Sequence, residues 1–134
     1  MIGVVDTSAL IRLFVPDGPR PEGFDDFLRG VERGINTAIA PELLVAEAAN
    51  VINKKRILGE LSEDESSRLL AEILSVPIRL FAHRPILLRA FDLARQCQLT
   101  VYDTLYIALA ENHGAAIFTV DRKMLESANS LRLI

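Results

Sequence analysis

Apolar residues follow two alternating patterns along the chain. Short runs rich in β-branched residues, with almost no polar interruption, are typical of strands buried on both faces of a parallel sheet. These strand-like runs cover residues 2–5, 35–40, 78–82, 115–120 and 131–134. Between them, apolar residues recur three and four positions apart, which predicts helices over 7–15, 24–33, 41–56, 62–76, 85–98, 104–113 and 122–128. The alternation predicts an α/β domain with a central, mainly parallel sheet.

Local signals predict where several helices begin and end. Pro41 is expected at the first helical position, where a missing N–H costs nothing. Residues 62–65 read Ser-Glu-Asp-Glu, which has the form of a capping box, and Pro77 is expected to stop the helix that follows. His113 precedes Gly114 and is typical of a helix C-terminus rather than of a catalyst.

Length and composition limit the possible classes of protein. The 134 residues predict one domain, residues 1–134. With 15 basic and 18 acidic residues the net charge is −3, so bulk charge does not indicate nucleic-acid binding, although acidic metal ligands can mask a local basic rim. One cysteine and two histidines argue against an internal disulfide, a zinc–cysteine site and a multi-histidine site. We expect a cytoplasmic protein, because no signal-peptide pattern and no bilayer-length apolar stretch is present.

Four acidic residues stand out because apolar sequence surrounds them: Asp6, Glu47, Asp103 and Asp121. Each has an ordinary explanation, since the three aspartates can cap helices and the glutamate can pair with an arginine. Taken together, they point to one place, because the ends of parallel strands and the starts of neighbouring helices converge on one edge of the sheet. Four unpaired carboxylates at that edge repel one another unless a cation neutralises them. Hard oxygen ligands favour Mg²⁺ or Mn²⁺.

Such a site suits the hydrolysis of a phosphodiester by a metal-activated water. The glycine-rich loops of nucleotide-binding proteins and the G-x-S-x-G motif of serine hydrolases are absent from the sequence. A receiver-like regulatory module, with Asp6 as phosphoacceptor, is a non-catalytic alternative. It would need a second acid two positions on, where this chain has Ser8.

The chain resembles a PIN-domain ribonuclease, and most closely the VapC-type toxins of toxin–antitoxin (VapBC) pairs. The matching stretches are residues 5–10, 41–50, 99–110 and 118–123. The resemblance implies a Rossmann-like, three-layer α/β/α sandwich and Mg²⁺- or Mn²⁺-dependent cleavage of single-stranded or loop RNA. It implies that the metal-binding acids are Asp6, Glu47, Asp103 and Asp121, and that Ser8 and Thr119 occupy the hydroxyl positions that orient carboxylates or water.

Residues that contact RNA are harder to predict from sequence. Asn50 lies one helical turn after Glu47 and is a candidate for holding a ligand or a phosphate, with an ordinary surface position as the alternative. Arg12 and Arg84 are candidates for a basic rim. Arg122 and Lys123 follow Asp121 and are candidates for contacting RNA phosphate, with a solvated helix start as the favoured alternative. Tyr102 and Tyr106 can stack on bases, but their apolar surroundings favour packing in the core.

The resemblance also implies partners. VapC toxins are usually inhibited by a VapB antitoxin and commonly form homodimers. The helices predicted at 24–33 and 62–76 are candidate surfaces, unless their apolar faces belong to the core. A PIN nuclease of RNA processing, acting without an antitoxin, is the alternative within the enzyme class.

Overall fold

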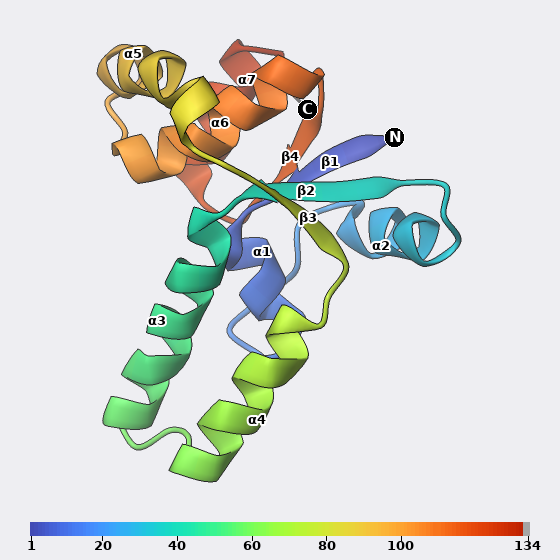
Figure 1. The fold of residues 1–134 in the computed structure, drawn as a ribbon, viewed down its shortest axis with the longest axis vertical. Helices are drawn as coiled ribbons and strands as arrows, with labels where there is room; N and C mark the ends of the chain where they lie inside the picture. The colour runs from blue at the N-terminus through green and yellow to red at the C-terminus, as the bar shows by residue number, and fades with distance from the viewer. Residues whose placement is uncertain (133–134) are drawn as a thin grey trace.

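The computed structural model describes residues 1–132, which form a parallel four-stranded sheet with helices around it (Figure 1). The strand order is β3-β2-β1-β4, and every neighbouring pair is parallel. The strands are β1 (Ile2–Val5), β2 (Thr37–Pro41), β3 (Ile78–Phe81) and β4 (Ala116–Phe118). The predicted fold class, an α/β sandwich with a parallel sheet, is confirmed.

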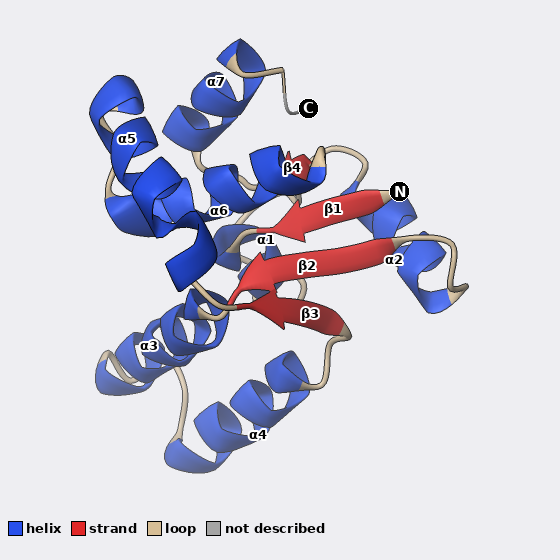
Figure 2. Cartoon of the chain, turned by 45° about the horizontal axis from the view of Figure 1, so that its top comes forward, coloured by secondary structure: helices blue, strands red, loops and turns tan. Residues whose placement is uncertain are grey.

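Helices cover both faces of the sheet (Figure 2). The central helix α6 (Val101–His113) contacts β1, β2 and β4 on one face and packs against α5 (Leu87–Cys97). On the other face lies α2 (Phe24–Glu32), whose Phe27 packs against Phe118 with ring centroids 4.6 Å apart. The remaining helices are α1 (Thr7–Arg12), α3 (Leu43–Ile57), α4 (Glu63–Leu74), α7 (Arg122–Ser130) and the short 3₁₀ helix η1 (Arg84–Ile86).

The middle of the sheet is fully buried, which explains the unbroken apolar runs in the sequence. Val4 and Val5 point to opposite faces of β1, and neither is exposed to solvent. Gly3 is required for close packing, because an added Cβ would lie 2.6 Å from Phe27 and 2.7 Å from Phe118. The apolar face of α2 therefore belongs to the core, since Phe24 and Phe27 are both buried.

Several predicted element ends are wrong. Pro41 does not begin a helix; it pairs with Phe81 as the last residue of β2. The helix begins at Leu43, whose N–H donates to Nε2 of His83 at 2.9 Å. A partner 40 residues away thus sets this helix start, and local sequence could not show it.

The C-terminal elements also differ from the prediction. Helix α6 begins three residues earlier than predicted, because Thr100 is its N-cap and accepts from the N–H of Asp103 at 3.2 Å. A strand was predicted over residues 131–134. Leu131 and Arg132 instead form a turn, with Arg132 at a φ of 60°, and residues 133–134 lie outside the described chain. The capping box at Ser62 and Glu65 is confirmed.

No helix within residues 1–132 is long and apolar enough to cross a membrane.

Candidate active site

Asp6 lies directly after β1 and is held by two hydroxyl groups. Its N–H donates to the carbonyl of Phe118 at 3.0 Å, which ties it to the end of β4. Ser8 Oγ and Thr119 Oγ1 each donate to Oδ2 of Asp6 at 2.7 Å. Although Asp6 is the N-cap residue of α1, its side chain makes no capping hydrogen bond. Both hydroxyls bind Oδ2, so the second oxygen, Oδ1, is not engaged by them and can face another ligand.

Backbone groups in turn fix these hydroxyls. The N–H of Val120 donates to Ser8 Oγ at 3.1 Å, and the N–H of Asp121 donates to Thr119 Oγ1 at 3.0 Å. Because each hydroxyl accepts one proton from the backbone, its own proton points to the carboxylate. Asp6 is thus oriented from both α1 and the segment after β4.

Glu47, in the second turn of α3, is held in the same manner. Thr7 Oγ1 donates to Oε1 of Glu47 at 2.8 Å, and the Tyr106 hydroxyl donates to the same oxygen at 2.6 Å. Thr7 follows Asp6 in sequence, whereas Tyr106 comes from the buried face of α6. Oε2 of Glu47 is left available, as Oδ1 of Asp6 is.

Asp103 and Asp121 occupy helix starts and are less enclosed. Asp103 lies in the first turn of α6 and is half-buried. Asp121 is exposed and caps α7, since its Oδ1 accepts from the N–H of Met124 at 3.1 Å. Of the three aspartates that the sequence offered as possible caps, only Asp121 caps a helix with its side chain.

A cleft of about 410 Å³ brings most of the predicted residues together. Asp6, Glu47 and Asp103 line it, and so do Ser8, Asn50 and Arg12. Among residues 1–132, the lining does not include Asp121, Thr119, Arg122 or Lys123. A fourth carboxylate in the cleft is Asp17, whose Oδ2 lies 3.1 Å from Nζ of Lys55.

Burial and mutual repulsion make the acids hard to ionise. The pKa of Asp6 is raised above 3.8, mainly by burial and further by the charge of Glu47, although the bonds from Ser8 and Thr119 oppose the shift. The pKa of Asp103 is also raised, by burial first and then by the charges of Asp121 and Asp6. A cation placed in the cleft would relieve both effects.

The cleft is suited to a hard cation whose coordination shell is only partly supplied by protein. Within residues 1–132, no three His, Cys, Asp or Glu side chains are grouped tightly enough to enclose an ion by themselves. Mg²⁺ usually binds through one or two carboxylates and keeps several waters or substrate phosphate oxygens. Available oxygens on Asp6 and Glu47, with Asp103 beside them, fit that requirement and do not fit zinc.

Sequence reasoning missed Thr7, Tyr106 and Asp17 as parts of the site. The signal for Tyr106 was its position three residues after Asp103, which places both on one face of a helix. The prediction that Tyr106 packs in the core is confirmed, yet its hydroxyl reaches the site. The same prediction for Tyr102 is wrong, because that side chain is 62% exposed.

Comparison with known proteins agrees with this arrangement. The family described as "PIN domain" matches residues 3–129. Ribonuclease VapC3 of Pyrobaculum aerophilum is 33% identical over 133 residues, which cover 96% of this chain and 95% of that protein. Ribonuclease VapC12 of Mycobacterium tuberculosis is 29% identical and covers 92% of this chain and 90% of its own length.

Solved structures show the same fold. The crystal structure of PAE2754 from Pyrobaculum aerophilum superposes with a TM-score of 0.71 and 27% identity, over 95% of this chain and 84% of that chain. VapC20 of Mycobacterium tuberculosis, a toxin that cleaves the sarcin–ricin loop, superposes with a TM-score of 0.65 and 14% identity, over 93% of this chain and 94% of that chain. At that identity, VapC20 supports the fold alone.

The parallel α/β sandwich with carboxylates at the strand ends is that of the PIN domain. The chain belongs to the PIN-domain family and, within it, to the VapC-type ribonucleases. Its enzymatic class is accordingly that of a ribonuclease.

Proposed function

We propose that the chain is a Mg²⁺- or Mn²⁺-dependent endoribonuclease and the toxin of a type II toxin–antitoxin system. The observation that carries the proposal is the pair Asp6 and Glu47, each held by two hydroxyls through one oxygen while the other oxygen stays available at the cleft. A rigid, charged pair of this kind costs stability unless it has a cationic ligand. VapC-type membership supports RNA as the substrate.

The residues of the cleft have distinct proposed roles. Asp6 and Glu47 would hold the ion, with Asp103 beside them and waters or phosphate oxygens completing its coordination, and Asp121 adds negative charge beside Asp103. When bound, the ion would supply positive charge beside the scissile phosphate and would lower the pKa of a bound water. Ser8 and Thr119 keep Asp6 oriented.

Cationic and amide groups near the acids suit contacts to the RNA backbone. Arg12 and Asn50 line the cleft and are placed to contact phosphate oxygens. Arg122 and Lys123 are exposed at the start of α7, next to Asp121, and we propose weaker contacts for them. RNA-cleaving toxins meet their substrates in the cytoplasm, and the proposed activity belongs there.

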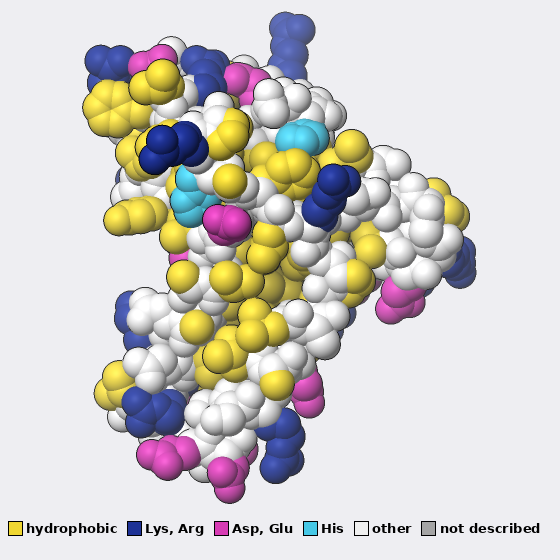
Figure 3. Space-filling view, viewed as in Figure 1, with side chains coloured by type: hydrophobic (Ala, Val, Ile, Leu, Met, Phe, Trp, Pro, Cys, Tyr) yellow, Lys and Arg dark blue, Asp and Glu magenta, His cyan; other side chains and the backbone are white. Residues whose placement is uncertain are grey.

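A VapB-type antitoxin and a second copy of the chain are the proposed protein partners. Apolar side chains gather between α3 and α4 in the space-filling view (Figure 3), where Leu74 is 54% and Leu80 is 40% exposed. This surface includes part of the helix predicted at 62–76. The helix predicted at 24–33 offers less apolar surface to a partner, because Phe24 and Phe27 are buried in the core.

Cleavage of RNA by the purified protein tests the enzymatic proposal. Cleavage should require Mg²⁺ or Mn²⁺, stop with EDTA and be lost in Asp6→Asn, which keeps the shape of the side chain but removes its charge. Cleavage that persists in Asp6→Asn, after purification removes contaminating nucleases, would exclude the proposed centre.

The antitoxin proposal has a separate test. Expression of the chain should arrest growth, and co-expression of a small reading frame adjacent to its gene should restore it. Growth arrest that no neighbouring frame relieves would favour the alternative, a PIN nuclease of RNA processing. The receiver-like alternative gains no support, since the chain belongs to a ribonuclease family.

A further inference from the structure

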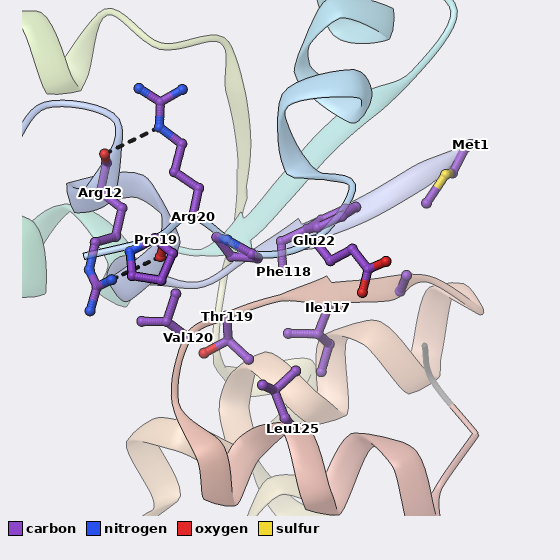
Figure 4. A pocket seen from close by; sticks show the side chains of 12 residues that line it. Met1, Arg12, Pro19, Arg20, Glu22, Ile117, Phe118, Thr119, Val120 and Leu125 are labelled. Carbon is purple, nitrogen blue, oxygen red and sulfur yellow. Dashed lines mark hydrogen bonds between the residues drawn. The ribbon is translucent and has the colours of Figure 1, made fainter. Parts of the chain in front are cut away.

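A second cavity adjoins the cleft and is not explained by the carboxylate centre. Its volume is about 630 Å³, which is within the range of roughly 300–1,000 Å³ that is usual for small-ligand pockets. It lies along β4 and the segment that follows it, between α7 and the loop of residues 16–22 (Figure 4). Its apolar wall consists of Ile117, Phe118 and Leu125, with Val120 at one end.

The cavity and the cleft share two residues, Arg12 and Val120. The backbone of Val120 also donates to Ser8, which holds Asp6. The two depressions therefore meet at Arg12 and Val120. This continuity indicates that the two depressions accommodate one extended ligand.

Arg12 is held in position at the junction by the loop. Its Nη1 donates to the carbonyl of Pro19 at 2.8 Å. Gly18 packs so closely that a Cβ there would lie 2.3 Å from the same Nη1. The loop thus immobilises the guanidinium where a chain would leave the cleft, and a phosphate is the group that it suits best.

Charge is distributed unevenly around the cavity. In Figure 4, Arg12 lies at the end near Val120, whereas Glu22 lies toward the opposite end, near Met1. Arg20 is engaged by Asp25 at 2.9 Å and donates to the carbonyl of Arg12, so it braces the loop. This arrangement suits a nucleotide, because the cation at the entrance can bind its phosphate and the apolar walls inside can contact its base.

We propose that this cavity is a base-binding subsite for a nucleotide that flanks the cleaved bond of single-stranded RNA. The inference rests on the proposed ribonuclease function, and it assigns to this cavity the preference of the enzyme for particular RNA sequences. Arg12 holds the intervening phosphate, and the base lies against Phe118 and Leu125. Single-stranded RNA suits such a site because its unstacked bases can be turned out of the chain.

An abasic scan tests the subsite. The probe is a short single-stranded RNA that contains one site cut by the wild-type protein, with one base removed at a time around that site. We expect kcat/KM to fall about tenfold when one particular flanking base is missing, in line with the usual binding free energy of one base stacked on a side chain. In Leu125→Trp, which fills the cavity, the intact RNA should already be cut about tenfold less efficiently, and removal of that base should cost little more.

The matched control is Glu126→Trp, because Glu126 is the next residue on α7 and is exposed. It introduces the same side chain outside the cavity and should keep the wild-type response to every abasic position. Thermal unfolding of both variants checks that α7 is intact. Crosslinking uses the wild-type protein, so misfolding of a variant cannot affect the result. An RNA that carries 4-thiouridine at the sensitive position should crosslink to residues 116–125.

The outcomes distinguish the subsite from the activity itself. If the wild-type protein cuts no RNA, the ribonuclease proposal fails and the subsite fails with it. If the wild type cuts RNA but no single abasic position matters, or Leu125→Trp keeps the wild-type sensitivity, only the subsite is excluded. Crosslinks confined to residues outside this cavity would also exclude it.

Discussion

The two halves of the carboxylate site are built by different means. Asp6 and Glu47 are each held by two side-chain hydroxyls, and those hydroxyls come from α1, α6 and the segment after β4. Asp103 and Asp121 instead depend on helix starts, and Asp121 uses its Oδ1 to cap α7. The first half is therefore fixed by tertiary contacts before any ligand binds, whereas the second half is positioned by local backbone. Fixed ligand geometry is what a metal-dependent reaction needs most.

The largest expected effect is on the hydroxyl-held half. Glu47→Gln keeps the side-chain shape but removes the charge, so kcat/KM for RNA should fall by more than about 100-fold, beyond the loss usual for residues that only support a ligand. Single-turnover cleavage at saturating Mn²⁺ measures it. Full activity in Glu47→Gln would mean that this half does not take part in catalysis.

Loss of one supporting hydroxyl should have the next largest effect. Tyr106→Phe removes one of the two donors to Oε1 of Glu47, and we expect a fall in kcat/KM of about 10–100-fold with weaker Mn²⁺ binding. Tyr102→Phe is the matched control, since Tyr102 lies one turn earlier on α6 with an exposed ring. If the two variants behave alike, the hydroxyl of Tyr106 does not position the acid.

The helix-start half should tolerate a neutral replacement better. In Asp121→Asn the cap is retained, because asparagine caps helices as well as aspartate does, and cleavage should fall by about tenfold or less. Asp121→Ala should in addition lower the free energy of unfolding by about 1 kcal/mol through loss of the cap. Urea unfolding and cleavage of the two variants, measured side by side, separate these contributions. A loss in Asp121→Asn as large as in Glu47→Gln would remove the distinction between the halves.

The smallest expected effect is on the stability of the metal-free protein. Because the pKa of Asp6 is raised by folding, its contribution to stability is present below 3.8 and is lost as the pH rises through the raised value. Near neutral pH the wild type bears the cost of ionising a buried carboxyl group, and Asp6→Asn does not. In EDTA the Tm of Asp6→Asn near neutral pH should therefore exceed that of the wild type by at least about 2 °C. The difference should shrink as the pH falls toward 3.8. Parallel Tm curves across the acid range would contradict a raised pKa.

Much of this architecture was accessible from the sequence because it depends on local pattern. The apolar run that ends at Asp6 predicted a buried parallel strand with an acid at its carboxyl end, and burial of Val4 and Val5 on both faces explains why the run has no polar alternation. Three of the four acids that the sequence brought together, Asp6, Glu47 and Asp103, line one cleft. Strand ends and the helix starts beside them converge on one edge of a parallel sheet, and that convergence is sufficient to predict this grouping.

Only the tertiary structure decided what holds each acid and where its remaining oxygen faces. The hydroxyl of Tyr106 reaches Glu47 across 59 residues, and His83 begins α3 from a distance of 40 residues, so neither contact leaves a trace in local sequence. The same holds for Arg12, whose guanidinium is fixed by the turn at Gly18 and Pro19. Side-chain hydrogen bonds between distant elements depend on how layers pack, and packing is set by the whole chain. The sequence alone therefore determined the sheet and which acids meet at its edge, while the packed fold decided how rigidly each of them is held.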